Sequence, residues 1–369
     1  MNSKDTIVIH PYLKSFRAQK EYLLDEAINL VKAINLNCLY SSSVGLEKIS
    51  PKTYLNTGFL VSLVKKKELL NIDLIFINTN LSPIQQRNLE TKLNCKIIDR
   101  TGLILEIFGS RAKSNEGKLS VMLASLQFQK SRLVRSWTHL ERQRGGAGFM
   151  GGPGEKQIES DKRQLTEQIN RLKKKIKNIT SIRNVQRYRR KKNQIPVISL
   201  IGYTNSGKSS LFNKLTKSNV LSKNMLFASL DSTIRKSFFN DINVLFIDTV
   251  GFIRDLPTTL IDSFKSTLDE IIFSDIILHV RDISNDNYLQ HKREVLKILN
   301  EIGVCSDDKR IIEVINKVDL IKNHNTHYYK QNKEAIFISA TKGSGIDELK
   351  NKIKLTLSID GFSLFKQSN

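Results

Sequence analysis

The stretch from Pro196 to Leu215 constrains the fold more than any other part of the chain. An apolar run, Pro196–Ile201, leads into the sequence GYTNSGKSS at residues 202–210, and a helical pattern follows at Leu211–Leu215. The spacing Gx4GK[ST] between a strand and a helix is that of a phosphate-binding loop, whose glycines let backbone N–H groups turn toward phosphate oxygens. We therefore expect a P-loop α/β domain, a mostly parallel sheet with helices on both faces.

Two side chains of this loop have predicted roles in binding a nucleotide. Lys208 would reach the β- and γ-phosphate oxygens, and the hydroxyl of Ser209 would ligate Mg²⁺. The loop contacts that we predict are Gly202, Tyr203, Thr204, Asn205, Ser206, Gly207, Lys208, Ser209 and Ser210.

Three more motifs each follow an apolar run and occur in the order typical of guanine-nucleotide sites. Val244–Ile247 precedes Asp248, Thr249, Val250 and Gly251, so Asp248 would hold the Mg²⁺ shell and the Gly251 N–H would meet the γ-phosphate. Ile311–Ile315 precedes Asn316, Lys317, Val318 and Asp319, and Ile336–Ile338 precedes Ser339, Ala340 and Thr341. Asp319 would accept hydrogen bonds from guanine, which adenine cannot donate, and Asn316 would brace the loops. Together these motifs predict GTP and GDP as ligands.

The positive charge of the chain is concentrated in one segment. The chain carries a net charge of +23, and residues 130–192 hold 19 basic and 5 acidic side chains. Helical patterns at 118–144 and from 155 onward flank a glycine-rich loop, 145–154, with six glycines and one proline. A coiled-coil-like seam follows on the second helix, formed by Leu165, Ile169, Leu172, Ile176 and Ile179.

Two basic helices joined by a glycine loop are typical of a segment that enters folded RNA. A solvated arm is the alternative, and a membrane-surface helix fits less well because the seam is narrow. The candidate RNA contacts are Arg144, Gly148, Phe149, Met150, Gly151, Gly152, Lys173, Lys174, Lys175, Arg189 and Arg190.

The rest of the composition excludes other classes. Three distant cysteines rule out a disulfide scaffold and a zinc ribbon, and no apolar run could span a bilayer. Short apolar runs alternate with helical stretches before residue 112, which predicts a small parallel sheet. The expected domains are an N-terminal α/β domain (1–112), a basic helical linker that we call the arm (113–194), a GTPase domain (195–358) and a short tail (359–369). We expect a cytoplasmic monomer, with peripheral membrane association as an option.

Beyond the phosphate loop, nearly the whole chain resembles the HflX-type GTPases. The resemblance is carried by Ser82–Glu90, Asp99–Thr101, Leu133–Gln143, Gly151–Asp161 and a segment similar to switch I, Phe227, Ala228, Ser229, Leu230 and Asp231 with Thr233 and Arg235. It implies binding to the large ribosomal subunit and its rRNA, splitting or rescue of stalled ribosomes under stress, and GTP hydrolysis stimulated by ribosomes.

Two residues bear on the implied mechanism. The family usually has Thr where this chain has Ser229, so either Ser229 or Thr233 would join Ser209 as a magnesium ligand. Phe252 follows Gly251, and an apolar side chain cannot orient the attacking water, which predicts slow hydrolysis by the protein alone. The predicted catalytic set is Lys208, Ser229 and Gly251. Asn205 is similar to the residue of potassium-stimulated GTPases, so K⁺ is a second candidate cofactor.

Two other functions share these motifs. One is a GTPase of ribosome assembly or tRNA modification. The other is an RNA-binding switch that does not hydrolyse GTP.

Overall fold

The computed structural model describes residues 5–15, 20–143, 153–218, 226–227, 230, 232–239, 242–321 and 335–359. These residues form two compact units. Residues 1–110 and 118–175 belong to the first unit, and residues 111–117 and 176–369 to the second.

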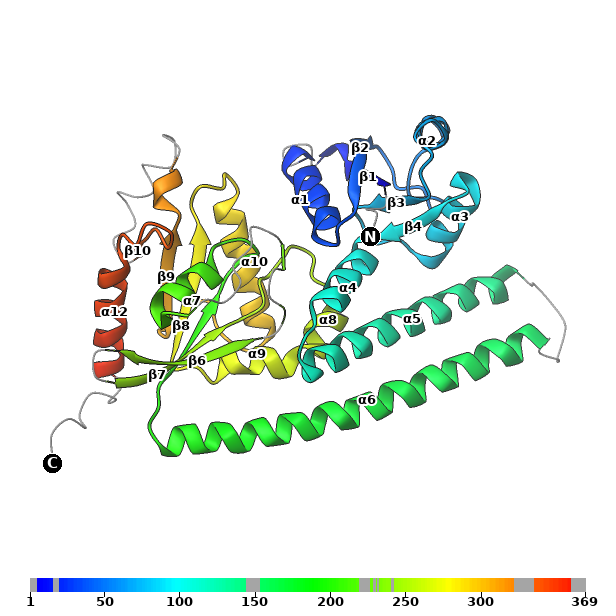
Figure 1. Ribbon diagram of the computed structural model, residues 1–369. Coiled ribbons are helices and arrows are strands. Elements are labelled where there is room, and N and C mark those ends of the chain that lie inside the picture. Colours follow the sequence, from blue (N-terminus) through cyan, green and yellow to red (C-terminus); the bar gives the residue numbers. More distant parts are fainter. Residues whose placement is uncertain are drawn as a thin grey trace, which may run out of the picture. The chain divides into compact units, whose positions relative to one another are not determined.

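The first unit contains the predicted small α/β domain. Its four strands form a parallel sheet in the order β2-β1-β3-β4 (Figure 1). The strands are β1 (Asp5–Leu13), β2 (Asn37–Leu46), β3 (Leu74–Ile77) and β4 (Lys96–Asp99), and the helices are α1 (Lys20–Ala33), α2 (Thr57–Leu69), α3 (Pro83–Leu93) and α4 (Arg100–Arg111).

Local sequence signals explain where α3 begins. The Ser82 side chain accepts a hydrogen bond from the Gln85 backbone, the Gln85 side chain accepts one from the Ser82 backbone, and Pro83 occupies the first turn. This capping box satisfies two N–H groups that a helix start leaves unpaired. Deeper in the domain, Arg100 donates to Glu26 at 2.7 Å, and both side chains are buried.

Two long helices follow, α5 (Asn115–Gln143) and α6 (Pro153–Lys192), which run antiparallel (Figure 1). The predicted seam is present on α6, where Ile169 and Leu172 are buried while Lys173–Lys175 are exposed. The glycine loop was predicted to extend to residue 154, and this is wrong at its end because Pro153 and Gly154 already belong to α6. Proline is favoured in a first helical turn, where its missing N–H costs nothing.

The second unit contains a six-stranded sheet in the order β10-β9-β8-β5-β7-β6. All neighbours are parallel except β6 and β7. The strands are β5 (Val197–Ile201), β6 (Thr233–Phe239), β7 (Ile242–Asp248), β8 (Ile276–Asp282), β9 (Ile311–Asn316) and β10 (Ile336–Phe337). The helices are α7 (Lys208–Thr216), α8 (Thr258–Ser263), α9 (Lys265–Ile272), α10 (Tyr288–Glu301) and α12 (Ile346–Ile359), with a 3-10 turn, η2 (Val318–Leu320).

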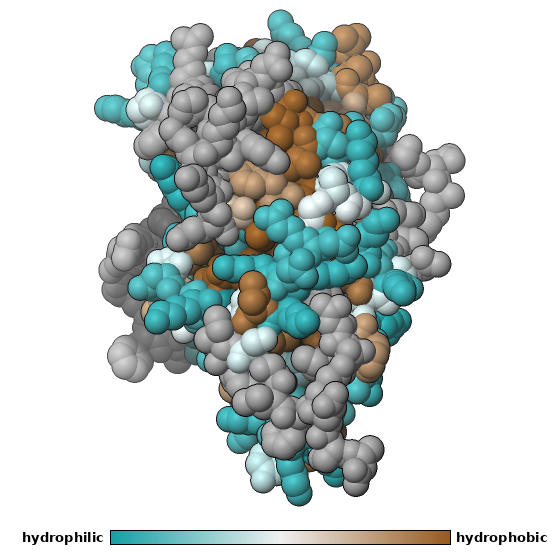
Figure 2. All heavy atoms as spheres, turned by 90° about the vertical axis from the view of Figure 1, so that its left-hand side faces the viewer, coloured by the Kyte–Doolittle hydropathy of each residue, from teal (hydrophilic) through white to brown (hydrophobic). Residues whose placement is uncertain are grey.

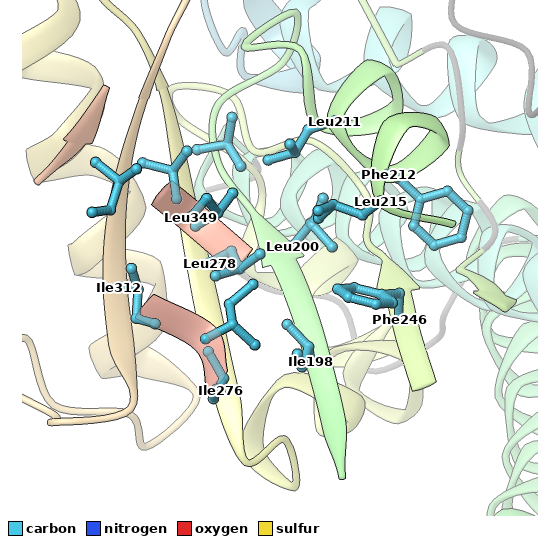
Figure 3. Close-up of a cluster of buried hydrophobic side chains, with 14 of the residues drawn as sticks. Ile198, Leu200, Leu211, Phe212, Leu215, Phe246, Ile276, Leu278, Ile312 and Leu349 are labelled. Carbon is cyan, nitrogen blue, oxygen red and sulfur yellow. The ribbon is translucent and has the colours of Figure 1, made fainter. Parts of the chain in front are cut away.

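The core of this unit lies between the sheet and helices α7 and α12 (Figure 3). Alternate strand residues such as Ile198, Leu200 and Leu278 meet Phe212 of α7 and Leu349 of α12. Because strand side chains alternate between faces, the neighbouring residues face the other side of the sheet. Around its centre, the face of the molecule seen from the α12 side is mainly hydrophilic (Figure 2).

The four predicted motifs end or follow four strands of this sheet. The phosphate loop follows β5, Asp248 ends β7, Asn316 ends β9, and Ser339 lies shortly after β10. These strands are parallel, so their carboxyl ends meet at one edge, where α/β sheets bind ligands. The predicted P-loop fold, a mostly parallel sheet with helices on both faces, is confirmed.

Candidate functional site

The phosphate loop joins β5 to α7 in a conformation that needs glycine at both ends. Gly202 and Gly207 have φ angles of +152° and +91°. A Cβ on Gly202 would lie 2.1 Å from the carbonyl oxygen of Val280, and one on Gly207 would lie 2.1 Å from Nδ2 of Asn316. Larger residues are therefore excluded, and the loop backbone turns tightly ahead of the N-terminus of α7.

Lys208 is buried at the start of α7. Its Nζ donates to the carbonyl oxygens of Gly202 and Tyr203, at 3.1 and 2.8 Å. Burial lowers the pKa of Lys208 to about 8, although the nearby Asp248 carboxylate acts in the opposite direction. Two neutral carbonyls stabilise an ammonium less well than phosphate oxygens would, so anionic phosphates would restore the charge.

Ser209 and Asp248 lie together beside the loop. The Ser209 hydroxyl donates to Oδ2 of Asp248 at 2.6 Å. Oδ1 of Asp248 is buried and accepts no hydrogen bond from the described residues. Burial raises the pKa of this carboxyl, while Ser209 and Lys208 oppose the rise. A hydroxyl next to a carboxylate with an oxygen to spare is the kind of oxygen donor set that suits Mg²⁺.

The segment after β7 is bonded to the phosphate loop. The Phe252 N–H donates to Gly202 O at 3.1 Å, and the Thr204 N–H donates to Phe252 O at 2.7 Å. Gly251 packs so closely that an added Cβ would lie 2.9 Å from Cγ2 of Thr204 and 3.1 Å from Nζ of Lys208. The Phe252 side chain is 2% exposed, so it lies in the protein interior.

Asn316 links the phosphate loop to the last motif. Its Nδ2 donates to Ser206 O at 2.9 Å, and its Oδ1 accepts from the Ala340 N–H at 3.0 Å. These two contacts join loops that follow three different strands, as the sequence suggested.

Asp319 and Lys317 lie beside these loops. A hydrogen bond from Ser339 holds the pKa of the Asp319 carboxyl below its usual range. Oδ1 of Asp319 is buried and accepts no hydrogen bond in the part of the chain that the structure describes. The Lys317 ammonium binds Oδ2 of Asp282 at 2.6 Å, which fixes the lysine stem. Asp319 therefore retains an acceptor for a donor pair such as that of guanine.

Tyr203 makes a contact that the sequence did not indicate. Its ring stacks on that of His291 in α10, with 3.8 Å between ring centroids and an angle of 4°. Its hydroxyl accepts from the Arg254 N–H at 3.0 Å. The second residue of the phosphate loop is thus tied to α10 and to the segment that follows Gly251.

The predicted switch I residues are only partly described. Phe227 and Leu230 are buried, while Ala228, Ser229 and Asp231 lie outside the described residues. Thr233 begins β6 and is the strand partner of Asp248. The choice between Ser229 and Thr233 as a magnesium ligand stays open.

The remaining predicted residues fall into three groups. Four residues at the phosphate site are buried: Thr204, Ser206, Thr249 and Val250. Asn205 is exposed in the same loop. Ser210 and Val318 are partly exposed, and Thr341 is exposed. Lys173, Lys174, Lys175 and Arg189 are exposed on α6, whereas Arg190 turns toward α9. Arg144, Gly148, Phe149, Met150, Gly151 and Gly152 lie outside the described residues.

This geometry defines the class of protein: the chain is a P-loop GTPase, an enzyme that hydrolyses GTP. Models of three families match it, described as "GTP-binding GTPase N-terminal" over residues 21–109, "GTP-binding GTPase Middle Region" over 111–190 and "50S ribosome-binding GTPase" over 197–317. Its relatives then narrow the class, and the chain belongs to the HflX family of GTPases. The alternative of a switch that does not hydrolyse GTP is set aside.

The relatives cover most of the chain. The GTPase HflX of Magnetococcus marinus is 44% identical over 90% of this chain and 77% of its own length. The GTPase HflX of Escherichia coli is 36% identical over 94% of this chain and 81% of its own length. A crystal structure of SsGBP with GDP is similar with a TM-score of 0.52 and 26% identity, covering 96% of this chain and 99% of that one. Among the helices that the structure describes, none is long and apolar enough to cross a membrane.

Proposed function

We propose that this GTPase binds the large ribosomal subunit and splits or rescues stalled ribosomes under stress. The proposal is carried by the likeness to HflX GTPases over most of the chain, together with the match to a family of 50S ribosome-binding GTPases. The excess of 14 positive charges at residues 130–192 supports an RNA partner, because phosphate neutralisation dominates protein–RNA affinity.

The proposed roles at the nucleotide site follow from the contacts described above. Lys208 exchanges its two carbonyl partners for β- and γ-phosphate oxygens. The Gly251 N–H meets the γ-phosphate, and Asp319 accepts from guanine. The bonds made by Asn316 support these assignments, since they join the phosphate loop to the guanine-side loops.

Ser209 and Asp248 would hold Mg²⁺, Ser209 directly and Asp248 through water, with Ser229 or Thr233 as a further ligand. The ion supplies positive charge to the β- and γ-phosphate oxygens when it is bound. Asn205, exposed at the loop with a φ of +62°, is the candidate contact for K⁺.

Hydrolysis would be slow without a partner. The buried Phe252 places no polar group near the γ-phosphate, so the ribosome or a rearranged switch I would have to orient the attacking water. Hydrolysis should therefore be measured in KCl and in NaCl, with and without large subunits. Stimulation by subunits no greater than stimulation by albumin would refute the ribosome-coupled function.

The decisive experiment for ribosome splitting is sucrose-gradient sedimentation of 70S ribosomes with the full-length chain and either GTP or a non-hydrolysable analogue. The expected result is protein comigrating with 50S particles and a loss of 70S. Intact 70S with no bound protein would contradict the proposal. Binding confined to immature particles would favour a role in ribosome assembly.

The salt dependence of binding tests the arm directly. Changing Lys173, Lys174 and Lys175 to Gln should weaken the salt dependence. The magnitude of the negative slope of log affinity against log salt concentration should fall by about two. The matched control changes Lys350, Lys352 and Lys354 on α12 of the GTPase domain, with the same loss of charge. Equal effects of the two triple variants would contradict the assignment of RNA contacts to the arm.

A further inference from the structure

Three arginines at the end of α6 converge on one buried carboxylate of the GTPase domain. Arg183, Arg187 and Arg190 are spaced by four and three residues, which places them on one face of the helix. Their target is Glu270 on α9, whose side chain is 2% exposed. We call these four residues the Glu270 cluster.

The contacts within the Glu270 cluster are close and unequal. Arg187 donates twice to Oε1 of Glu270, from Nε at 3.0 Å and from Nη2 at 2.8 Å. Arg190 donates to Oε2 at 3.2 Å, and Arg183 lies 4.0 Å from Oε1. Both carboxylate oxygens are therefore engaged, and Arg187 is the principal partner.

Neighbouring groups hold two of these arginines in place. The Arg187 guanidinium lies over the ring of Phe273, 4.7 Å from the ring centroid. Phe273 directly follows the last residue of α9. Arg183 also bonds Glu116 at the start of α5, at 2.7 Å. Residues 111–117 and 176–192 belong to the same compact unit as the GTPase sheet, so the cluster lies wholly inside that unit.

The position of Glu270 in the sequence connects the cluster with the nucleotide site. The chain leaves the phosphate site at Gly251, passes through α8, and enters α9 at Lys265 without an intervening strand. Leu268 and Ile271 anchor α9 in the interior, and the Arg310 guanidinium binds the carbonyl oxygens of Ile272 and Ser274 at its end. A segment packed in this way moves as a body and not residue by residue.

The covalent connection alone would not fix the direction of α6. Only residues 193–196 separate Lys192 from β5, and Gln194 already departs from helical geometry with a φ of +50°. The linker N–H groups at 193–195 bond back to α6, and a carboxylate held by guanidinium groups from successive helical turns adds a restraint on both the position and the rotation of the helix.

We propose that Glu270 is a positioning residue that couples the direction of α6 to the segment after Gly251. The inference rests on the proposed ribosomal function, since it assigns to this cluster the path by which RNA contacts on the arm influence GTP hydrolysis. Glu270 lies on α9, outside the phosphate loop and the strand-end motifs, and it acts through α9.

The test uses the full-length chain with Glu270→Gln and Arg187→Gln. Gln keeps the size of Glu270 but removes the charge that attracts three cations. Glu301→Gln, an exposed carboxylate at the end of α10, is the matched control. GTP hydrolysis alone should stay within about twofold of wild type in all variants, whereas stimulation by large subunits should fall about tenfold in the two cluster variants.

Amide hydrogen exchange supplies a readout that needs no ribosome. Wild type should exchange at residues 176–192 at different rates with GDP and with a non-hydrolysable GTP analogue, and the cluster variants should lose that difference. A nucleotide-dependent difference that persists in Glu270→Gln, or that is absent from wild type, would overturn the coupling. If wild type shows the difference but no stimulation by subunits, the ribosomal function fails and the coupling stands.

Discussion

The buried Lys208 makes nucleotide binding depend on protons. Burial lowers the pKa of its ammonium to about 8, from an ordinary value of 10.5. Phosphates placed against Nζ would raise this pKa again, because opposite charges favour the ionised form. Nucleotide binding above pH 8 must therefore take up a proton at Lys208, and affinity must fall as the pH rises.

The size of the effect follows from the lowered pKa. With a pKa of about 8, roughly three quarters of the Lys208 side chains are neutral at pH 8.5 and about a tenth at pH 7. Binding should therefore take up about 0.75 protons per nucleotide at pH 8.5 and about 0.1 at pH 7, and affinity should weaken about fourfold between these values. The unfolded chain, with its ordinary lysine pKa, binds more protons between pH 8 and 10.5, so for Lys208 alone the stability of the free protein rises with pH in that window.

Isothermal titration of a non-hydrolysable GTP analogue with Mg²⁺, in two buffers of different ionisation enthalpy, measures this proton uptake. GMP is the control, because it carries the same base but lacks the phosphates that would reach Lys208. His279 cannot be the source, since burial and neighbouring cations lower its pKa to about 3 and it stays neutral throughout. Uptake at pH 8.5 no larger than at pH 7 would show that Lys208 is already charged before nucleotide binds.

Three further substitutions test the site and the N-terminal domain. Gly251→Ala places a Cβ 2.9 Å from Cγ2 of Thr204. The affinity for a GTP analogue should therefore fall about tenfold, while the affinity for GDP should change less than about twofold. Equal losses of the two affinities in equilibrium binding would contradict a γ-phosphate contact. Asn316→Ala removes two buried hydrogen bonds, and urea denaturation should show the unfolding free energy of the GTPase domain falling by about 2–3 kcal/mol. Arg100→Met leaves Glu26 buried without its cation, which should destabilise the N-terminal domain by about 3–5 kcal/mol in the same assay; an unchanged midpoint would show that the pair contributes nothing net.

The strand-end motifs were predictable because backbone geometry dictates them. A phosphate loop needs Gly202 and Gly207, whose positive φ angles exclude other residues, and the apolar runs before Asp248 and Asn316 are buried strands. The capped start of α3 at Ser82 was predictable for the same reason, since one short segment contains the whole signal.

Edge strands were harder to predict than central ones. Strand β2 runs from Asn37 to Leu46 through three serines, and no apolar run in the sequence marks β6. Both strands lie at the edges of their sheets, where one side of each strand pairs with no other described strand. Polar residues are tolerated there, so hydrophobic periodicity is weak.

Contacts between distant segments could not be read from the sequence. Arg189 and Arg190 belong to one basic run, yet Arg189 is exposed while Arg190 binds Glu270. Successive helical residues point about 100° apart, and only the packing of α9 against α6 decides which side is inward. The stacking of Tyr203 on His291 depends in the same way on two segments 88 residues apart in sequence.

The Glu270 cluster also determines where the chain can be cut. A protein beginning at residue 195 would contain every nucleotide-binding motif but would lack all three arginines that meet Glu270. Glu270 would then lose its cationic partners, and the face of α9 that the end of α6 covers would be exposed to water. A protein beginning at residue 176 would keep the three arginines. We therefore expect the smallest stable GTPase fragment of this chain to be longer than its sequence motifs suggest, because it should include nearly five turns at the end of α6.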